Sequence, residues 1–361
     1  MILAALALAL VPLQEGVADL PPLSREALAA ADRGLAWLAD RQSPDGSWSG
    51  DVGYKLEEGY RTWNPNAGHV GVTALAAMAF LAGGHVPDRG PYGEVVSHAL
   101  DWVLAQARPD GYISSNETRM YSHAFATLFL AEVYGMSDRE DLRPTLQRAV
   151  DLIVASQNEE GGWRYQPHVA DADMSVTACQ VMALRSARNI GIRVPVSTID
   201  RAVAYVRNSA VRPDDPPWSF QWGSRPGSFR YQPQLNSRAS FALTAAGITV
   251  LHGAGVYADE DIERGFQRLE EDLTAFTRSY GRRGGGHYYF YYGHYYAVQA
   301  FHIAGGERYR NYLEVVQREL LAMQRADGSF PNEIGPGRAY GTATACLVLQ
   351  IPKEYLPIFQ R

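Results

Sequence analysis

Two kinds of helical pattern alternate along the chain from Ser24 onward. In the first kind, apolar residues recur on one face at helical spacing, as Leu28, Leu35 and Leu38 do, and charged residues fill the opposite face. One apolar and one charged face predict helices on the outside of a larger assembly. The pattern occurs in residues 28–38, 95–102, 142–154, 199–206, 262–273 and 313–323.

The second kind of helix is apolar or built from small residues on nearly every side, and it must be covered all round. Such helices begin near Val70, Ser122, Ser175, Ser240, Tyr295 and Tyr340. Six outer and six inner helices predict an all-α fold, an α/α toroid in which six outer-inner pairs form a closed ring over residues 19–361. The alternative is an open superhelical solenoid, which would need a polar capping repeat at each end.

A turn motif of the form Gln-x3-Gly-x-aromatic recurs in residues 42–48, 157–163 and 324–330 and indicates a repeat protein. An internal register follows when Thr73, Thr177 and Thr344 are taken as equivalent. Positions four and two residues before each Thr then start an inner helix, which predicts polar and aromatic residues at one mouth of the ring. With the register extended to every repeat, they are His69, Gly71, Arg119, Tyr121, Asp173, Ser175, Asn236, Arg238, Tyr292, His294, Tyr340 and Thr342.

The same register places the only two cysteines, Cys179 and Cys346, in the third and sixth repeats. These repeats face each other across a ring of six, too far apart for a disulfide. The sequence therefore predicts two separate, buried thiols that pack as small apolar residues.

The composition sets limits on the function. Of the 361 residues, 46% are hydrophobic and 20% charged, which is typical of a globular protein with a large core. The net charge is −6 and no basic stripe occurs, so nucleic acid is not expected as a partner. No Gly-rich phosphate loop, Gly-x-Ser-x-Gly elbow or His-Glu-x-x-His motif is present, and neither a cofactor nor a metal is expected.

Residues 1–18 are expected to be a signal peptide, which predicts export to the periplasm or the extracellular space. Twelve apolar residues from Ile2 onward precede the small residues Gly16 and Ala18, which suit cleavage. The run is too short to span a bilayer. The usual Lys or Arg before such a run is absent, and a mis-assigned start or an apolar tail is the alternative.

These features resemble the prenyltransferase and squalene-oxidase repeat family, which includes triterpene cyclases and protein prenyltransferase β subunits. The carriers are the three turns, Asp171-Ala172-Asp173 at the start of the third inner helix, and His294. The resemblance covers Ser24 to about Ile351. It implies an α/α toroid with a cavity at the mouth formed by inner-helix N-termini, and an isoprenoid or similar apolar lipid as ligand. Peripheral contact with a membrane would suit such a ligand, and the oligomeric state stays open.

Triterpene cyclases of this family carry Asp-x-Asp-Asp-Thr-Ala, whose middle Asp protonates the substrate. Aligned without gaps from Asp171, this chain keeps Asp173 as the acid. Aligned instead on Thr177 and Ala178, the motif begins at Asp173 and places Ser175, which cannot be that acid, at its position. The second alignment matches more residues and argues against cyclisation. Helix capping is a further interpretation of both aspartates, since an Asp at a helix start accepts backbone N–H bonds.

The prenyltransferase β subunits hold zinc with Asp-x-Cys and a distant His. The corresponding residues here are Asp173, Ser175 and His294. Loss of the thiolate removes the softest zinc ligand and argues against zinc-dependent prenyl transfer.

Candidate site residues follow from the register and from the aromatic segment 287–296. Aromatic rings suit the wall of an apolar cavity, and ordinary packing is the alternative explanation for about half of these tyrosines. The candidate catalytic residues are Asp173, Asp171 and His294. The candidate ligand-binding residues are His69, Arg119, Tyr121, His123, Trp163, Ser175, Asn236, Arg238, Tyr292 and Tyr340.

Three functions remain open at this point. The first is an exported terpene cyclase- or prenyltransferase-like toroid that binds an isoprenoid and, if active, cyclises or isomerises it. The second is a non-catalytic binding or scaffold toroid. The third is a saccharide-active α/α barrel, which would need a second cavity carboxylate opposite Asp173.

Overall fold

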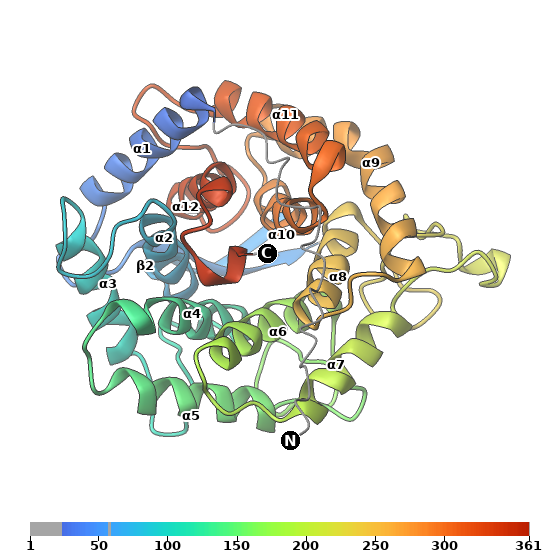
Figure 1. Ribbon diagram of the computed structural model, residues 1–361, viewed down its shortest axis with the longest axis horizontal. Helices are drawn as coiled ribbons and strands as arrows, with labels where there is room; N and C mark the ends of the chain where they lie inside the picture. Colours follow the sequence, from blue (N-terminus) through green and yellow to red (C-terminus); the bar gives the residue numbers. More distant parts are fainter. Residues whose placement is uncertain (1–23, 57–58, 361) are drawn as a thin grey trace, which may run out of the picture.

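The computed structural model describes residues 24–56 and 59–360, so the predicted signal peptide, residues 1–18, lies outside the described residues. The described chain contains twelve α-helices, which match the twelve predicted stretches (Figure 1). The amphipathic helices are α1 (Arg25–Asp40), α3 (Gly93–Ala105), α5 (Leu142–Ala155), α7 (Val196–Asn208), α9 (Glu260–Tyr280) and α11 (Gly306–Met323). The apolar helices are α2 (Val70–Ala82), α4 (Met120–Val133), α6 (Met174–Asn189), α8 (Phe241–Gly253), α10 (Tyr288–Ala304) and α12 (Arg338–Gln350).

The apolar helices lie inside the amphipathic ones, as Figure 1 shows. Helix α2 is buried along its whole length, whereas α1 buries only the face that carries residues such as Leu35 and Leu38. Each inner helix contacts the next one from α2 to α12, and α12 also contacts α2. The described chain is therefore mostly helical and two-layered, which agrees with the predicted α/α toroid, and a two-stranded hairpin is the exception to the predicted all-α fold.

The first helix of the chain packs mainly against the last. Helix α1 contacts α12 more extensively than it contacts α2, the inner helix that follows it in sequence. Gly34 allows this close approach, because a Cβ atom there would lie 2.5 Å from Cys346 Sγ. Helices that pair in space are thus not always those that are adjacent in the chain.

In the three repeats that contain it, the glutamine of the recurring turn contacts a neighbouring outer helix. Gln157 Nε2 donates to Gly161 O of its own turn at 2.8 Å and to Thr198 O of α7 at 2.9 Å. The Gly161 position requires a glycine, because its φ is +94° and a Cβ atom would lie 2.3 Å from a backbone oxygen of α7. The motif is therefore a structural joint between repeats.

The aromatic residue that ends the turn packs inward beneath it. Trp163 is buried and donates from its indole nitrogen to Ile153 O of α5 at 2.7 Å. Trp48 makes the equivalent bond to Leu38 O at 2.8 Å. Trp163 is thus placed as a support of the turn, and its prediction as a ligand-binding residue is not matched by its position.

In four of the repeats, a threonine hydroxyl fixes the turn to the inner helix that follows. Thr177 Oγ1 accepts a hydrogen bond from Trp163 N at 3.1 Å, and Thr73 accepts the same bond from Trp48 N at 3.0 Å. In the sixth repeat, Phe330 N donates to Thr342 at 3.0 Å. The predicted register is therefore correct for the first and third repeats and wrong by two residues in the sixth, where Thr342 is the equivalent residue.

The register is also wrong in the fourth and fifth repeats. Phe229 N donates to Thr244 at 3.1 Å, which places the start of α8 at its N-cap Ser240, so that Asn236 and Arg238 precede the helix. The N-cap of α10 is His287, seven residues before His294. Repeated tyrosines hid this shift in the sequence.

A β-hairpin that the sequence did not predict lies between the first turn and α2. Strands β1 (Ser49–Leu56) and β2 (Gly59–Gly68) pair antiparallel, with an irregular register around Val52. His69 N donates to Trp48 O at 3.0 Å, so the hairpin leaves and re-enters the fold at one point. Its mixed polar and glycine-containing sequence lacks sustained alternation, the usual signal of a strand.

The C-terminal residues turn back into the middle of the inner layer (Figure 1). Leu356, Ile358 and Phe359 are buried there, and Ile358 N donates to Glu132 Oε2 at 3.1 Å. Glu132 lies near the C-terminal end of α4, opposite the end where the inner helices begin.

Both cysteines are buried and free, as predicted. Cys346 faces α1, where its thiol donates to Ala31 O at 3.5 Å, and Cys179 donates to Val176 O of its own helix at 3.0 Å. Among the described residues, none of the helices combines the length and the apolar character of a membrane span.

Candidate functional site

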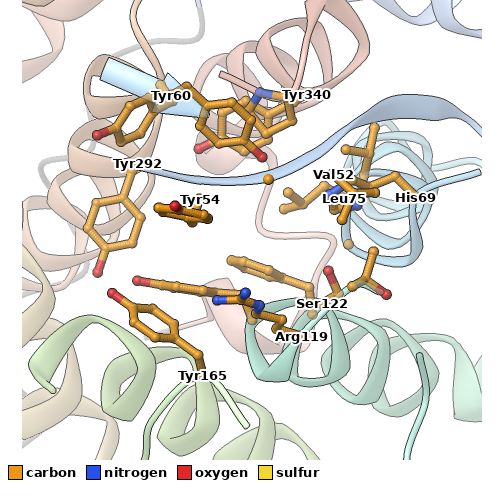
Figure 2. Close-up of a pocket in the computed structure, with 18 of the residues that line it drawn as sticks. Val52, Tyr54, Tyr60, His69, Leu75, Arg119, Ser122, Tyr165, Tyr292 and Tyr340 are labelled. Atoms are coloured by element: carbon orange, nitrogen blue, oxygen red, sulfur yellow. The ribbon is translucent and has the colours of Figure 1, made fainter. Parts of the chain in front are cut away.

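A cavity of about 180 Å³ lies at the end of the fold where inner helices begin. Helices α2, α4, α10 and α12, the hairpin and the loop before α6 supply its wall (Figure 2). Nine of its twenty lining residues are tyrosine or phenylalanine: Tyr54, Tyr60, Tyr121, Phe125, Tyr165, Tyr288, Tyr289, Tyr292 and Tyr340. His69, Val52, Val72, Leu75, Arg119 and Glu117 also take part in it.

The tyrosine hydroxyls give the cavity neutral polar points on an apolar wall. Burial raises the pKa of Tyr121 and Tyr292 well above the usual value, so both hydroxyls stay protonated at neutral pH. Tyr60 donates to Asp51 O at 2.9 Å, whereas the buried hydroxyl of Tyr292 has no hydrogen-bond partner in the described part of the chain. Figure 2 shows the hydroxyls of Tyr292 and Tyr165 on the same side of the cavity.

A hydrogen-bonded chain leads from the cavity to Asp173. The Tyr121 hydroxyl donates to Ser175 Oγ at 2.5 Å, and Ser175 Oγ in turn donates to Asp173 Oδ1. Asp173 is the N-cap of α6 and is fully buried; its Oδ1 also accepts from Val176 N at 3.0 Å. Asp173 does not line the cavity itself and is connected to it through Ser175 and Tyr121.

Arg164 holds the other side of the aspartate pair. Its Nη1 donates to Asp173 Oδ2 at 2.9 Å and to the Tyr231 hydroxyl at 2.9 Å, and its Nε lies 3.2 Å from Asp171 Oδ2. The Asp171 side chain is 56% exposed, so the two aspartates differ in environment although they share one arginine. Capping and ion pairing thus account for the acidic motif at the start of α6.

Arg119 contributes a guanidinium group to the cavity wall. It is the N-cap residue of α4, and its side chain makes no capping hydrogen bond. Its Cζ lies 4.4 Å from the ring centre of Trp63, 5.8 Å from that of Tyr54 and 6.0 Å from that of Tyr165. The guanidinium is therefore held among the aromatic rings of the wall (Figure 2).

Five predicted ligand-binding residues come together in this wall: His69, Arg119, Tyr121, Tyr292 and Tyr340. Ser175 lies one hydrogen bond behind them. His69 caps α2, where its Nδ1 accepts from Val72 N at 3.3 Å, and burial lowers its pKa to about 4. Its imidazole is consequently neutral at pH 7.

Other predicted residues lie elsewhere. His294 is buried between α9 and α11, with its ring nitrogens 3.2 Å from Thr277 Oγ1 and 3.0 Å from the Tyr312 hydroxyl, and burial lowers its pKa to about 3. His123 accepts from Ile113 N at 3.1 Å, the place that threonine takes in other repeats. The predicted position of His294 at the mouth is wrong, because the register extended to the fifth repeat started the inner helix too late in the sequence.

Asn236 and Arg238 also lie outside the cavity wall. Asn236 is exposed, and the guanidinium of Arg238 stacks 5.1 Å from the ring centre of Tyr231. Both precede α8, so the predicted position at its start is wrong.

Sequence reasoning missed several residues of the wall. Tyr54 and Tyr60 come from the unpredicted hairpin, and Tyr165 from the loop that follows the third turn. Tyr288 and Tyr289 are in the aromatic segment, and a register anchored on His287 would have placed them at the helix start. Their signal was present in the sequence but masked by the neighbouring tyrosines.

Sequence comparison relates this chain to terpene cyclases, although no protein-family profile matches it. It is 31% identical over 191 residues to drimenyl diphosphate synthase of Streptomyces showdoensis, and 30% identical over 144 residues to squalene–hopene cyclase of Bradyrhizobium diazoefficiens. These matches cover 52% and 38% of this chain. They span only 31% and 20% of the two relatives.

Solved structures share the fold at lower identity. A variant of a type II terpene cyclase from Scytonema, in complex with geranylgeranyl dihydroxybenzoate, has a TM-score of 0.58 at 14% identity, covering 92% of this chain and 98% of that one. An inactive α-1,6-mannanase variant of Salegentibacter sp., in complex with α-1,6-mannotriose, has a TM-score of 0.61 at 8% identity, covering 90% and 98%. At these identities the likeness concerns the fold alone. The sequence relatives named as cyclases, together with this fold, confirm the resemblance of the chain to the terpene cyclase-like α/α toroids of the prenyltransferase and squalene-oxidase repeat family.

Proposed function

We propose that this protein is terpene cyclase-like and binds an isoprenoid or similar apolar ligand in the tyrosine-lined cavity. The observation that carries the proposal is the wall itself, in which eight tyrosines and Phe125 surround an open space at the inner-helix N-termini. Aromatic faces pack against apolar chains and attract positive charge through their quadrupole. Such a wall suits both an isoprenoid and a carbocation derived from it.

The open cavity also bears on the alternatives. A purely structural toroid would fill this space with its own side chains, and this cavity is not filled. A saccharide hydrolase needs two carboxylates flanking the bond that it cleaves. Among the described residues, Glu117 is the one carboxylate in the cavity wall, and Asp173 lies behind Ser175. The likeness to a mannanase therefore supports a shared fold and no shared reaction.

We further propose that any cyclisation or isomerisation ends at Tyr121: its hydroxyl oxygen takes the proton that the carbocation loses as the alkene forms, while the Tyr121 proton passes to Ser175 and the Ser175 proton to Asp173. The Tyr121 hydroxyl is the member of the Tyr121–Ser175–Asp173 chain that lines the cavity. Asp173 accepts from Ser175 and pairs with Arg164, so in this arrangement its carboxylate orients Ser175 and, through it, Tyr121, and is the final acceptor of the proton. Ser175 stands where the acid of a triterpene cyclase is expected, and it serves here as the link.

Binding is tested with short neutral prenyl alcohols, because the enclosed space is small. Farnesol should bind the purified protein saturably in isothermal titration calorimetry. Tyr289→Ala, in the wall, should weaken this binding by about tenfold, which corresponds to about 1.4 kcal/mol of lost contact. Tyr355→Ala, at an exposed tyrosine outside the wall, is the matched control and should bind as the wild type does. If the wild-type protein binds no prenyl compound, the proposed function is wrong.

Turnover is tested separately, by gas chromatography and mass spectrometry of products from prenyl substrates. Tyr121→Phe and Ser175→Ala should keep ligand affinity within about threefold and abolish product formation. Equal turnover by wild type and Tyr121→Phe would remove the relay from the proposal and leave ligand binding intact.

Two further parts of the proposal concern the molecule as a whole. We propose that the six helix pairs close into a ring, which the contacts of α12 with both α1 and α2 support. We also propose that residues 1–18 direct export. N-terminal sequencing of protein from the growth medium and periplasm of the expression host should begin after Ala18, and an intact leader in both fractions would contradict export.

A further inference from the structure

The wall of the cavity carries one cationic side chain, Arg119, among the described residues. Its guanidinium is fixed by the rings of Trp63, Tyr54 and Tyr165. Rings attract a cation but cannot accept its hydrogen bonds in the way a carboxylate does. The donors of Arg119 therefore remain available to whatever occupies the cavity.

The nearby Arg164 shows the contrast. Arg164 is neutralised by Asp173 at 2.9 Å and Asp171 at 3.2 Å, whereas Arg119 forms no ion pair with any described residue. The nearest candidate in sequence, Glu117, lines the same cavity but is exposed and does not pair with Arg119. Within the part of the chain that the structure describes, the charge of Arg119 is thus left without a counter-charge.

A wholly apolar ligand would leave that charge unbalanced. A guanidinium beside an apolar chain loses hydration and gains no partner, and a carbocation close to it would be repelled. A ligand with an anionic group placed at Arg119 removes both penalties, because arginine binds carboxylate and phosphate oxygens through paired N–H bonds.

The surroundings of Arg119 provide space for such a group. A second hollow opens beside the cavity and shares Glu117, Thr118 and Arg119 with it. Arg108 and Gln166 line this hollow, and Arg108 likewise forms no ion pair in the described chain. Arg119 therefore stands between an aromatic cavity and a polar hollow with a second arginine. The unpaired hydroxyl of Tyr292 adds a donor on the cavity side.

We propose that the ligand is an amphiphile whose apolar chain lies against the tyrosines and whose anionic head, a phosphate or a carboxylate, is bound by Arg119. This inference rests on the proposed function and adds to it the chemical class of the ligand and the position of its head. Arg119 and the polar hollow bind the head, and the aromatic cavity holds the chain.

The test compares matched probes with the same chain: farnesol, farnesyl phosphate and farnesoate, titrated into the full-length protein by calorimetry. Farnesyl phosphate or farnesoate should bind about tenfold or more tightly than farnesol, and the tighter of the two identifies the head. Arg119→Gln should abolish this preference, measured as the ratio of the two affinities in the same variant. Arg119→Lys, which keeps the charge, should retain part of it, and Glu117→Gln should strengthen it by removing a like charge.

Arg278→Gln is the matched control, since Arg278 is an exposed arginine outside the cavity wall. It should preserve the preference. Equal binding of farnesol and both anions, unchanged in Arg119→Gln, would overturn the head-group inference and leave the proposed apolar site in place. Loss of the preference in Arg278→Gln as well would assign it to the overall charge of the surface and overturn the inference. Binding of no probe at all would overturn both proposals.

Discussion

Asp173 illustrates how one side chain can serve the fold and the site together. It caps α6 through Val176 N, pairs with Arg164 and accepts the hydrogen bond from Ser175 that orients Tyr121. Capping, one of the interpretations available from the sequence, is therefore present. The hydrogen bonds to Ser175 and Arg164 add a second role that capping alone does not include.

We expect Asp173→Asn to reduce both stability and ligand turnover. An asparagine can still accept from Val176 N, but it leaves the partly buried Arg164 without its closest counter-charge, which should lower the free energy of unfolding by about 1–3 kcal/mol. Urea denaturation measures this loss. Asp171→Asn is the control, because Asp171 is exposed and should cost less than about 1 kcal/mol. Equal losses in the two variants would contradict the role given to the buried pair.

The predictability of the site also differs from residue to residue. His69 and Tyr121 could be placed from the sequence because Thr73 and His123 occupy equivalent positions and no gap lies between anchor and helix start. Asn236 could not, because Ser240 caps α8 after an insertion of unknown length. Tyr54 and Tyr60 belong to a hairpin whose position over the cavity depends on tertiary contacts that no local pattern encodes.

At the scale of elements, the hairpin is the largest departure from the repeat plan. Val52 is the one large apolar residue of the described hairpin that is fully buried. The hairpin nevertheless contributes Tyr54 and Tyr60 to the cavity wall. It contributes more to the site than to the core. Its ends are held together by the bond from His69 N to Trp48 O.

Replacing residues 52–65 by Asn-Gly should therefore spare the fold and damage the site. We expect a thermal midpoint within a few degrees of the wild type, since little apolar area is lost, and prenyl binding weakened by about tenfold or more. Differential scanning calorimetry and titration measure the two effects. The double variant Tyr54→Ala/Tyr60→Ala keeps the hairpin backbone and removes only the two rings. Comparing it with the shortened chain separates the effect of the rings from that of the hairpin backbone. Unchanged binding in the shortened chain would show that the hairpin does not form part of the site.

The contact between α1 and α12 allows a second test at this scale. Gly34→Ala would place a methyl group 2.5 Å from Cys346 Sγ, and the resulting overpacking should cost about 1–3 kcal/mol, offset in part by the better helix propensity of alanine. Adding Cys346→Ala removes the clashing atom. The double variant should thus be more stable than the sum of the two single variants predicts, as measured by urea denaturation. Strict additivity would contradict the packing.

For the molecule as a whole, the end opposite the cavity contains a buried acid. Glu132 accepts from Ser186 Oγ at 2.5 Å and from Ile358 N of the C-terminal segment at 3.1 Å. Burial raises the pKa of Glu132 to about 7. Because the folded pKa lies above the usual value, the native state binds the proton more tightly, and stability is greatest below about pH 4.5 for this group and is lost as pH rises through 7.

Glu132→Gln should remove this pH dependence. The difference in free energy of unfolding between wild type and variant should shift in favour of the variant by about 0.8 kcal/mol as the pH rises from 6.5 to 8.5, with almost all of the shift complete by pH 8. Urea denaturation across this range measures it. The window avoids the buried histidines, whose lowered pKa values make them lose stability only as pH falls below about 6.5. Glu307→Gln on the exposed start of α11 serves as control, and a parallel response there would contradict the assignment to Glu132.

Most of the architecture could be predicted from the sequence, because the burial of a helix determines which of its own residues are apolar, and this pattern can be read within a single segment of the chain. Twelve helices and their division into two layers follow from whether apolar residues occupy one face or all faces, as α1 and α2 show. The spatial pairing was not accessible. That α1 packs on α12 depends on Gly34 meeting Cys346 across more than three hundred residues, a contact without a local signature.

The glutamine of the last turn connects the sixth repeat to the first helix of the chain. Gln324 Nε2 donates to Gly328 O of its own turn at 3.0 Å and to Ala30 O of α1 at 2.7 Å. Gln157 makes the corresponding pair of bonds to its own turn and to Thr198 of α7, so the joint between the two ends of the chain has the same chemistry as a joint within it. If the helix pairs close into a ring as proposed, covalent order and spatial order are separable. A circularly permuted chain that started at α3 and was linked from its C-terminal segment to α1 would then retain these glutamine bonds.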